Sequence, residues 1–415
     1  MGPPGRCRPA DRRPRMSAPL PPAALRDAAG PAAAAVESPE AELPATTRQV
    51  VFPRAGTIEV REAALPAPGP DDLLLRVVLV GVCATDLHLL AGHIGDPFPL
   101  VPGHEFVGEV AAIGATAAAR RGLAVGDPVA VEMLLPCRSC ARCREGRYNL
   151  CEADDPAGGH ARGRQLGVNI PATVEPGLWG GYAQHLWVPA EAVVHRLPEG
   201  MPWRRAVLVE PLAVACRALT RGRLTPGEDV VVLGPGPVGL LAAAAARSAG
   251  AGRVVVIGTR ENRLALARRF GADATVNLRE EGSPEAVDAA VRRALGGGRP
   301  DLVVEIAGTP TAQQQAVRLV RRGGRVVLAG ACGADAPVTF LADEDLLTRE
   351  IDLLPSFLSA GGFEPAIRLL ERGEHPFEDL VTHRVALEGV RSAYELIEGR
   401  TDDVVKVVVD PWAAA

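Results

Sequence analysis

The stretch Val230-Val-Val-Leu-Gly-Pro-Gly-Pro-Val-Gly239 decides the fold, because it joins an apolar strand to a helix through three regularly spaced glycines. Glycine is needed where a chain turns tightly and brings backbone N–H groups against a pyrophosphate at a helix N-terminus. Glycines that only loosen a turn or allow close helix packing are the alternative interpretation. Because a second strand follows at the expected distance, the pattern predicts a dinucleotide site formed by Gly234, Gly236, Pro237, Val238 and Gly239.

Outward from this stretch, apolar strands alternate with helices, a pattern that builds a parallel sheet covered by helices. We expect strands at 229–233, 253–257, 302–306, 325–328 and 351–354, and helices at 238–249, 261–270, 312–320 and 344–349. The preceding part predicts a small barrel-like domain with strands at 49–52, 57–61, 73–81, 105–113 and 128–131. The last part predicts helices at 363–372 and 387–397 and a strand at 404–409.

Length and composition exclude several classes of protein. With 415 residues the chain has room for two domains and a large core. Its 45 basic and 50 acidic residues leave no general basic surface for nucleic acid. The apolar run 230–246 is interrupted by glycine and proline, so no membrane span is expected. Residues 1–46 carry no secretory signal and predict a disordered extension of a cytoplasmic protein.

The end of the second strand bears on the choice between NAD and NADP. An acidic residue at this position usually accepts hydrogen bonds from the adenosine ribose and repels a 2′-phosphate. Here Gly258 removes the carboxylate, while Thr259 and Arg260 offer a hydroxyl and a guanidinium to a 2′-phosphate. Alternatively, Arg260 is an ordinary surface residue and Glu261 binds the ribose. We favour NADP on this chemistry.

Four cysteines within fifteen residues form the most specific metal-binding pattern in the chain. Their spacing is Cys137-x2-Cys140-x2-Cys143-x7-Cys151. Four thiolates complete the tetrahedral shell of a structural zinc ion, at about 2.3 Å per bond. Buried free thiols and local disulfides are poor alternatives, because the compartment is reducing and arginines surround the cysteines.

A second group of metal-binding residue types is dispersed along the chain. It comprises Cys83, the adjacent pair His104 and Glu105, and Glu210. Taken singly, these are equally a small core residue, a turn histidine and a helix N-terminal acid. Together they offer one thiolate and several harder ligands, the mixture expected where zinc keeps a position open for water or substrate. Asp86 is then expected to orient His104.

These segments resemble the zinc-containing medium-chain dehydrogenase/reductase family, the alcohol and polyol dehydrogenases. The resemblance covers about residues 47–411. It rests on segments in the family's order: Gly81-Val-Cys-Ala-Thr-Asp-Leu-His88, Pro102-Gly-His-Glu-Phe106, the four-cysteine loop, Val209-Glu-Pro-Leu212 and the glycine-rich turn. It implies an α/β fold, with a GroES-like, β-rich catalytic domain split around a doubly wound Rossmann domain. The expected divisions are an extension at 1–46, the catalytic domain at 47–212, the Rossmann domain at 213–355 and a catalytic-domain return at 356–415.

The resemblance also implies site roles. Cys83, His104 and Glu210 would bind a catalytic zinc, and Glu105 could exchange into the shell. The four-cysteine loop would bind a second, structural zinc. The presence of Glu210 instead of a cysteine is more similar to the polyol, sorbitol-type and threonine-type branches than to the ethanol-type enzymes.

The reaction implied by the resemblance is reversible hydride transfer between a secondary alcohol and NAD(P). Thr85 would accept the hydroxyl proton and pass it, through the nicotinamide ribose, to His88 and solvent. Thr85 as a strand-end hydroxyl and His88 as a surface histidine remain the simpler interpretations. A homodimer or homotetramer is expected, with strands around 338–341 pairing across a two-fold axis.

Two departures from the family pattern limit these expectations. Ala84 stands where many relatives have glycine or arginine, and Gly258 stands where NAD-using relatives have aspartate. A zinc-independent quinone-type reductase and a non-catalytic nucleotide- and zinc-binding regulator are the competing functions. A pocket for a bulky or cyclic alcohol is a further hypothesis, with ordinary packing as its alternative, and its candidate lining residues are Leu89, Phe98, Trp179 and Phe357.

Overall fold

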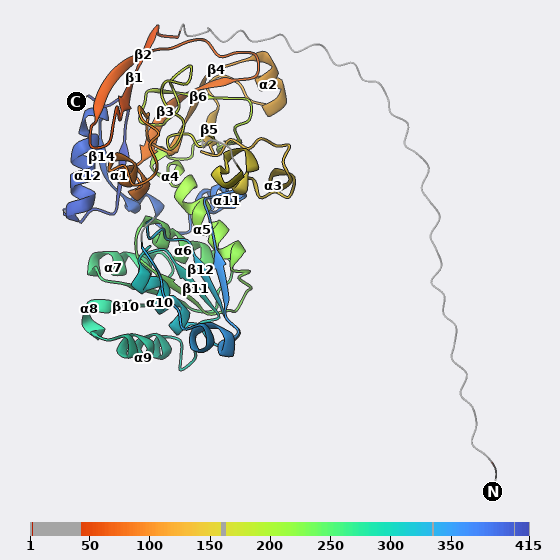
Figure 1. Ribbon diagram of the computed structural model, residues 1–415, viewed down its shortest axis with the longest axis vertical. Coiled ribbons are helices and arrows are strands. Elements are labelled where there is room, and N and C mark those ends of the chain that lie inside the picture. Colours follow the sequence, from red (N-terminus) through yellow and green to blue (C-terminus); the bar gives the residue numbers. More distant parts are fainter. Residues whose placement is uncertain (1, 3–42, 159–162, 334–335, 402, 415) are drawn as a thin grey trace. The chain divides into compact units, whose positions relative to one another are not determined.

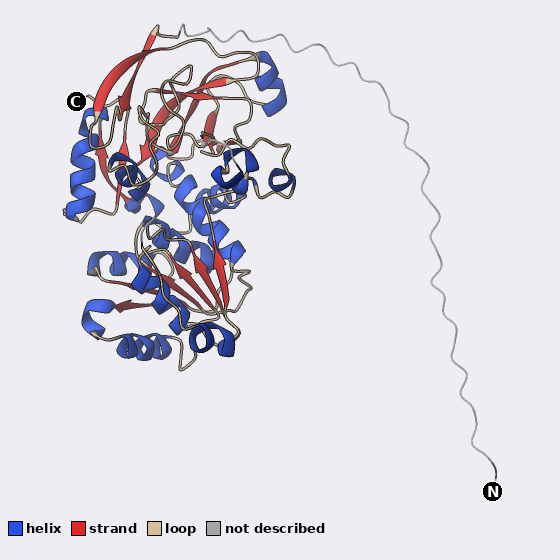
Figure 2. Ribbon diagram, in the orientation of Figure 1, coloured by secondary structure: helices blue, strands red, loops and turns tan. Residues whose placement is uncertain are grey.

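The computed structural model describes Gly2 and residues 43–158, 163–333, 336–401 and 403–414. The predicted extension 1–46 therefore lies outside the described residues, apart from Gly2 and 43–46, and Thr46 already begins a strand. Within the described ranges, no helix combines the length and the apolar character that a membrane span requires. In these ranges the strands form three sheets, and helices pack against them (Figures 1 and 2).

The glycine-rich turn belongs to a six-stranded sheet. All neighbouring strands in it are parallel, in the order β10-β9-β8-β11-β12-β13. Because β8 and β11 lie in the centre and the strand order reverses between them, the sheet is doubly wound. The strands are β8 (Val230–Leu233), β9 (Val254–Gly258), β10 (Ala274–Asn277), β11 (Leu302–Glu305), β12 (Arg325–Leu328) and β13 (Asp352–Pro355).

Both faces of this sheet are buried, which explains why its strands are continuously apolar instead of alternating. In β8, Val230 and Val232 pack in one hydrophobic cluster with α6 and with α5 (Val209–Arg221), whereas Val231 and Leu233 pack in another with α9 and α10. The helices that follow the strands are α6 (Pro237–Ser248), α7 (Glu261–Arg269), α8 (Leu278–Glu281), α9 (Pro284–Ala294) and α10 (Pro310–Leu319).

The first half of the chain builds a seven-stranded sheet that the end of the chain completes. Its order is β14-β15-β3-β4-β5-β7, with β6 also paired to β3. Strand β15 is antiparallel to β3, so residues that follow the six-stranded sheet return to the first one. The strands are β3 (Leu73–Gly81), β4 (Glu105–Ile113), β5 (Pro128–Val131), β6 (His185–Val188), β7 (Val194–Arg196), β14 (Val381–Val385) and β15 (Lys406–Val409).

A two-stranded antiparallel sheet of β1 (Thr46–Val51) and β2 (Glu59–Ala64) precedes it. The helix α5 begins directly after α4 and packs against both α6 and α11. The remaining helices are α1 (Ala84–Leu90), α2 (Ala115–Arg121), α3 (Ala141–Arg144), α4 (Trp203–Ala206), α5 (Val209–Arg221), α11 (Phe363–Arg372) and α12 (Val390–Gly399).

Two predicted elements are wrong. The helix expected at 344–349 is a π-helical turn, Ala342–Leu346, followed by a 3₁₀ turn, Leu347–Arg349, and Glu350 ends it in the left-handed conformation. The segment 338–341 forms no strand, and the edge strand of the parallel sheet is β13. In 341–350 three successive acidic residues separate two apolar pairs, Leu341-Ala342 and Leu346-Leu347, so the segment has no sustained helical spacing.

Candidate metal centres and cofactor site

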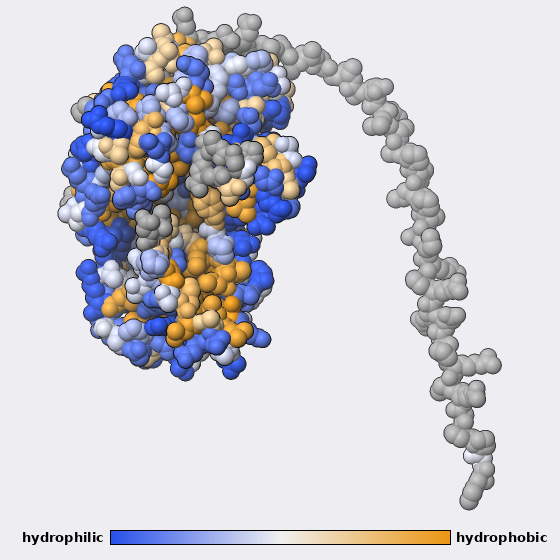
Figure 3. All heavy atoms as spheres, viewed as in Figure 1, coloured by the Kyte–Doolittle hydropathy of each residue, from blue (hydrophilic) through white to orange (hydrophobic). Residues whose placement is uncertain are grey.

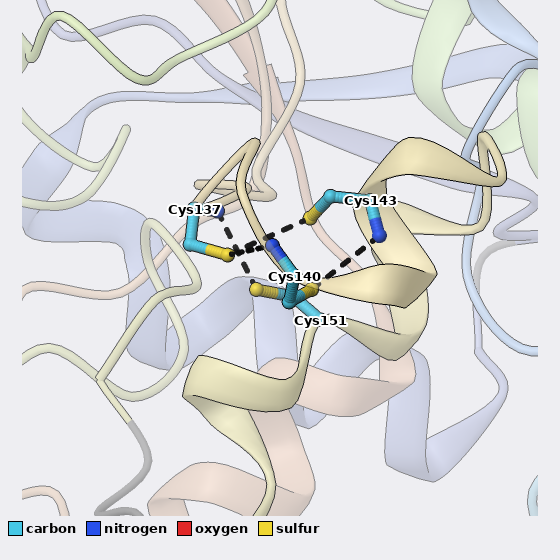
Figure 4. Close-up of side chains that lie close together, drawn as sticks. All are labelled: Cys137, Cys140, Cys143 and Cys151. Carbon is cyan, nitrogen blue, oxygen red and sulfur yellow. Dashed lines mark hydrogen bonds between the residues drawn. The ribbon is translucent and has the colours of Figure 1, made fainter.

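The four predicted cysteines converge on one point of the loop that contains α3 (Figure 4). Their sulfur atoms lie within 4.8 Å of one another, and none forms a disulfide. Backbone N–H groups point at these sulfurs: Cys140 donates to Cys137 Sγ, Cys143 to Cys140 Sγ, and Cys137 to Cys151 Sγ, each at 3.4 Å. Amide donors stabilise thiolates, so the loop fits a tetrahedral cation held by four sulfurs.

The acidities of these thiols also fit a cation. Burial raises the pKa of Cys137, but hydrogen bonds from the backbone N–H groups of Cys140 and Ser139 outweigh it and bring the pKa to about 6. Burial and the Cys140 side chain raise the pKa of Cys143 to about 12. A bound cation would offset the mutual repulsion of neighbouring thiolates, so the loop fits a metal ion.

The predicted second group is also brought together, with one exception. The ligand atoms of Cys83, His104 and Glu105 lie within 4.8 Å of one another. Cys83 precedes α1, and His104 and Glu105 stand at the start of β4, so two adjacent strand ends deliver the three side chains. Glu210, in the first turn of α5, is not one of this group of three, although its carboxylate interacts with Glu105 and His104.

Asp86 lies behind His104, as predicted for a residue that orients it. Asp86 is fully buried, and its Oδ1 is 3.3 Å from His104 Nδ1. Burial lowers the pKa of His104, but the charge of Asp86 and the neighbouring Cys83 raise it well above its usual range. With Nδ1 facing a carboxylate, the other ring nitrogen is free to face a metal ion.

A buried ion pair that sequence reasoning missed completes this group. Lys406 Nζ at the start of β15 contacts Glu105 Oε2 and donates to Val82 O at 2.9 Å. Gly81 lies between these two side chains, and a Cβ there would be 2.0 Å from Glu105 Oε2 and 2.8 Å from Lys406 Cε. The absence of a side chain at Gly81 therefore makes room for the pair.

The charges around Glu210 leave room for a cation. Burial, followed by the Glu105 carboxylate, raises the pKa of Glu210 to about 7. Lys406 is the ammonium that faces Glu105, Glu210 and Cys83 together. A divalent cation beside Cys83 and His104 would offset the mutual repulsion of the two buried carboxylates, so the site fits such an ion.

The helix α1 carries the two residues predicted to move a proton. Thr85 Oγ1 lies 3.7 Å from Cys83 Sγ and is half-buried. His88 is exposed, and its Nδ1 lies 3.4 Å from His93 Nδ1. Thr85 and His88 are three residues apart in a helix and therefore share a face, which leads from the Cys83 group towards solvent.

The glycine-rich turn has the close approaches that a dinucleotide site requires. Gly234 has a φ of +106°, and a Cβ at Gly239 would lie 1.9 Å from Gly234 O. Gly236 is the N-cap of α6 and faces open space, with Arg263 Nη1 the nearest side-chain atom, 4.0 Å from a built Cβ. Pro237 occupies the first helical position. The turn thus presents bare backbone at a helix N-terminus, which suits a pyrophosphate.

Arg260 in the β9–α7 turn and Arg263 in α7 lie close to other guanidinium groups. Burial lowers the pKa of Arg260, and the neighbouring Arg400 and Arg279 lower it further. Burial and then Arg260 lower the pKa of Arg263 to about 10, and its buried Nε has no hydrogen-bond partner among the described residues. Mutually repelling guanidiniums fit a dianionic phosphate.

Gly258 proves to have a packing role besides its place in this turn. A Cβ there would lie 2.3 Å from Pro235 Cγ, and Thr259 follows at the partly buried end of β9. An aspartate at 258 would therefore displace the glycine-rich turn. A Gly258→Asp exchange is for this reason no clean test of cofactor choice.

Three of the four predicted pocket residues belong to one hydrophobic core, and the fourth, Phe357, does not. Leu89 and Trp179 are buried in the core of the seven-stranded sheet, and Phe98 packs against the same core. Phe357 is 49% exposed. Their positions give the bulky-alcohol pocket no support.

Comparison with known proteins assigns the chain to a family. Residues 69–199 match the family model described as alcohol dehydrogenase GroES-like domain, and residues 237–372 match zinc-binding dehydrogenase. The chain is 38% identical over 342 residues to a probable alcohol dehydrogenase of Mycobacterium tuberculosis, covering 81% of this chain and 90% of that protein. It is 32% identical over 348 residues to the sorbitol dehydrogenase of Bacillus subtilis, covering 82% and 90%.

A solved structure supports the same family assignment. The crystal structure of a putative zinc-binding dehydrogenase from Sinorhizobium meliloti 1021 bound to NADP has a TM-score of 0.77 and 30% identity, covering 89% of this chain and all of that one. The chain therefore belongs to the zinc-containing medium-chain dehydrogenase family, with the GroES-like and Rossmann folds expected of it.

Proposed function

We propose that the protein catalyses reversible hydride transfer between NADP and a secondary alcohol at a zinc ion bound by Cys83, His104 and Glu210. The observation that carries this proposal is the meeting of Cys83, His104 and Glu105 within 4.8 Å, with Asp86 behind His104. Cys83, His104 and Glu210 would hold a zinc ion, whose Lewis acidity would lower the pKa of the substrate hydroxyl. Bound NADP supplies the hydride acceptor.

The roles of the chain's own residues follow from their positions. Asp86, with Oδ1 3.3 Å from Nδ1 of His104, orients the ring so that the other nitrogen faces the metal. Lys406 forms an ion pair with Glu105, which lies beside Cys83 and His104 and is available to exchange into the metal shell. Glu210, in the first turn of α5, is the third ligand of this proposal. Thr85 Oγ1 accepts the substrate proton, and His88, on the same face of α1, releases it to solvent.

The second metal site, formed by the four cysteines, has a structural role in this proposal. All four ligands come from the protein and from one loop, which leaves no position open for substrate. The enzyme would therefore carry two zinc ions per subunit, one for folding of the loop and one for chemistry.

For the cofactor we propose NADP over NAD. Arg260 is the candidate for the 2′-phosphate, and Arg263, which sequence reasoning did not single out, reaches the glycine-rich turn beside Gly236. No carboxylate pairs with Arg260 or Arg263 among the described residues, so a phosphate would meet unshielded guanidiniums there.

We further propose a homodimer or homotetramer and the domain division 47–212, 213–355 and 356–415. The division is supported by the return of β14 and β15 to the first sheet. Assembly is supported by the open edge of β13 and by Leu341 and Leu347, which are 54% and 69% exposed. Hydrophobic side chains also gather on the lower part of the face shown in Figure 3.

The substrate class proposed is a polyol or another secondary alcohol, because sorbitol dehydrogenase is among the relatives. The test is formation of NADPH or NADH at 340 nm with polyols, cyclic alcohols and amino alcohols, for the wild type and Cys83→Ser. Alcohol-dependent turnover that Cys83→Ser abolishes supports the proposal. Quinone reduction that survives Cys83→Ser would instead indicate the zinc-independent reductase, and no turnover with any class would indicate the non-catalytic regulator.

A further inference from the structure

The buried tyrosine Tyr182 makes a contact that the reaction scheme above does not use. It lies between the glycine-rich segment 178–181 and β6, and its side chain is completely buried. Its hydroxyl donates a hydrogen bond of 2.9 Å to Asp86 Oδ2. A buried hydroxyl that donates to a buried carboxylate is a costly arrangement to break, so it fixes the carboxylate.

The two oxygens of Asp86 have separate tasks. Oδ2 accepts from Tyr182 and also from the backbone N–H of Cys83 at 2.9 Å. Oδ1 is left to face His104 Nδ1 at 3.3 Å. Because a carboxylate is planar, two donors on one oxygen set the direction of the other, and Tyr182 thereby determines how Asp86 meets His104.

The backbone and ring of Tyr182 contact the segment that precedes His104. Its backbone N–H donates to Pro102 O at 2.9 Å, and a Cβ at Gly103 would lie 2.5 Å from its ring. Tyr182 thus contacts the residues just before His104 with its backbone and ring, and the partner of His104 with its hydroxyl. Only the hydroxyl is removed by a change to phenylalanine.

We propose that Tyr182 is a positioning residue that strengthens binding of the catalytic zinc by holding Asp86 against His104. The proposal rests on the proposed metal site at Cys83. Partners of metal-binding histidines change metal affinity by about 10- to 100-fold when they are lost. Tyr182 acts through Asp86, so we expect the lower end of this range, about a tenfold weaker affinity in Tyr182→Phe.

Tyr394 provides a matched control. It is also buried, lies close enough to interact with Asp86 and Tyr182, and differs from phenylalanine by the same single oxygen. Its hydroxyl makes no hydrogen bond of good geometry within the described part of the chain. Tyr394→Phe should therefore bind the catalytic zinc within about twofold of wild type.

The experiment is equilibrium dialysis of the full-length protein against buffers of graded free zinc, with zinc measured per subunit. The equivalent that disappears in Cys83→Ser identifies the catalytic ion. If the wild type does not bind this zinc ion, the proposed function fails. If the wild type binds it and Tyr182→Phe binds it as tightly, only the role of Tyr182 is overturned. Equal losses in Tyr182→Phe and Tyr394→Phe would also overturn it, because they would indicate packing and not the hydroxyl.

Two further readouts separate positioning from general stability. Cobalt substituted at the same site should show a changed d–d absorption spectrum in Tyr182→Phe and the wild-type spectrum in Tyr394→Phe. In case Tyr182→Phe folds poorly, the wild type can be labelled with 3-fluorotyrosine, since the chain has only 3 tyrosines. The ¹⁹F resonance of Tyr182 should shift on zinc binding at the Cys83 site, and an unchanged resonance would contradict the proposal.

Discussion

Replacing Lys406 with methionine is expected to be among the most destabilising single changes in this protein. Lys406 and Glu105 are 3% and 2% exposed, so the change leaves a carboxylate in the core without its ammonium. It also removes the hydrogen bond to Val82 O. Methionine keeps most of the length of the side chain, so the loss is mainly one of charge.

The size of the effect follows from the burial of the pair. Breaking a buried ion pair by removing one partner costs about 3–5 kcal/mol, because the remaining charge is uncompensated. Glu210, close to Glu105, adds a second carboxylate to the same space. At about 2.1 cal/mol/K per residue, the 415-residue chain has an unfolding entropy of about 0.9 kcal/mol/K, so the expected fall in Tm is about 3–6 °C.

Thermal unfolding of four proteins at one fixed zinc concentration tests this: wild type, Lys406→Met, Glu105→Gln and the double variant. The double variant should recover much of the loss, because it leaves no unpaired charge. Arg223→Met is the surface control, since Arg223 and Asp352 are 61% and 53% exposed, and it should cost less than about 1 kcal/mol. A Lys406→Met protein that melts with the wild type, or a double variant as unstable as both single losses added, would refute the reasoning.

Three other predictions follow from the sites. Arg260→Ala should lower kcat/KM for NADP by about 10- to 100-fold and leave kcat/KM for NAD nearly unchanged, because charge-assisted hydrogen bonds contribute about 1.5–3 kcal/mol. Arg268→Ala, at an exposed position of α7, is the control. An Arg260→Ala protein with unchanged kcat/KM for NADP would contradict the phosphate role. Cys143→Ser should lower Tm or dissociate the oligomer while turnover by the remaining folded protein persists, since a structural ligand contributes folding free energy. Tm and light scattering measure these effects. A variant that loses turnover but keeps its Tm and its oligomeric mass would contradict a structural role for the four-cysteine loop. Burial and Arg76 lower the pKa of His185 to about 4, so the folded protein favours the neutral imidazole. The free energy of unfolding should therefore fall by about 1 kcal/mol per pH unit as the pH drops from about 6.5 to about 4. His185→Gln should remove this contribution from Tm measured against pH, and an unchanged slope would contradict it.

The parts that sequence reasoning predicted correctly are local in the chain. The apolar strand, the glycine turn and the helix after it are contiguous, so period and turn chemistry identify β8 and α6 directly. The four cysteines are likewise neighbours in one loop. Continuous apolar strands between helices indicated a sheet buried on both faces, and the two hydrophobic clusters on either side of β8 confirm it.

What was missed depends on contacts between distant segments. Lys406 is the only lysine of the chain, but nothing in its surroundings in the sequence connects it to Glu105 on another strand of the sheet. The same holds for the hydroxyl of Tyr182 on Asp86. A single lysine within an apolar strand was the one available indication, since a lysine is rarely buried without a partner.

Other errors came from sterics and from weak periodicity. Gly258 was interpreted only as a missing carboxylate, whereas the ring of Pro235 occupies the space of its Cβ. The strand β13 was predicted correctly at its place in the chain. The strand expected to pair between subunits, however, was placed at 338–341, where no strand forms. Backbone pairing at a sheet edge is decided by neighbours that a sequence pattern does not contain.

Zinc content measured together with turnover tests the central claim most directly. The wild type, purified without chelators, should contain two zinc ions per subunit and reduce NADP in the presence of a secondary alcohol. Cys83→Ser should remain folded, retain one zinc and lose turnover almost completely. A Cys83→Ser protein that keeps both zinc ions, or one that oxidises the alcohol at the wild-type rate, would contradict the assignment of the Cys83 group as the catalytic metal site.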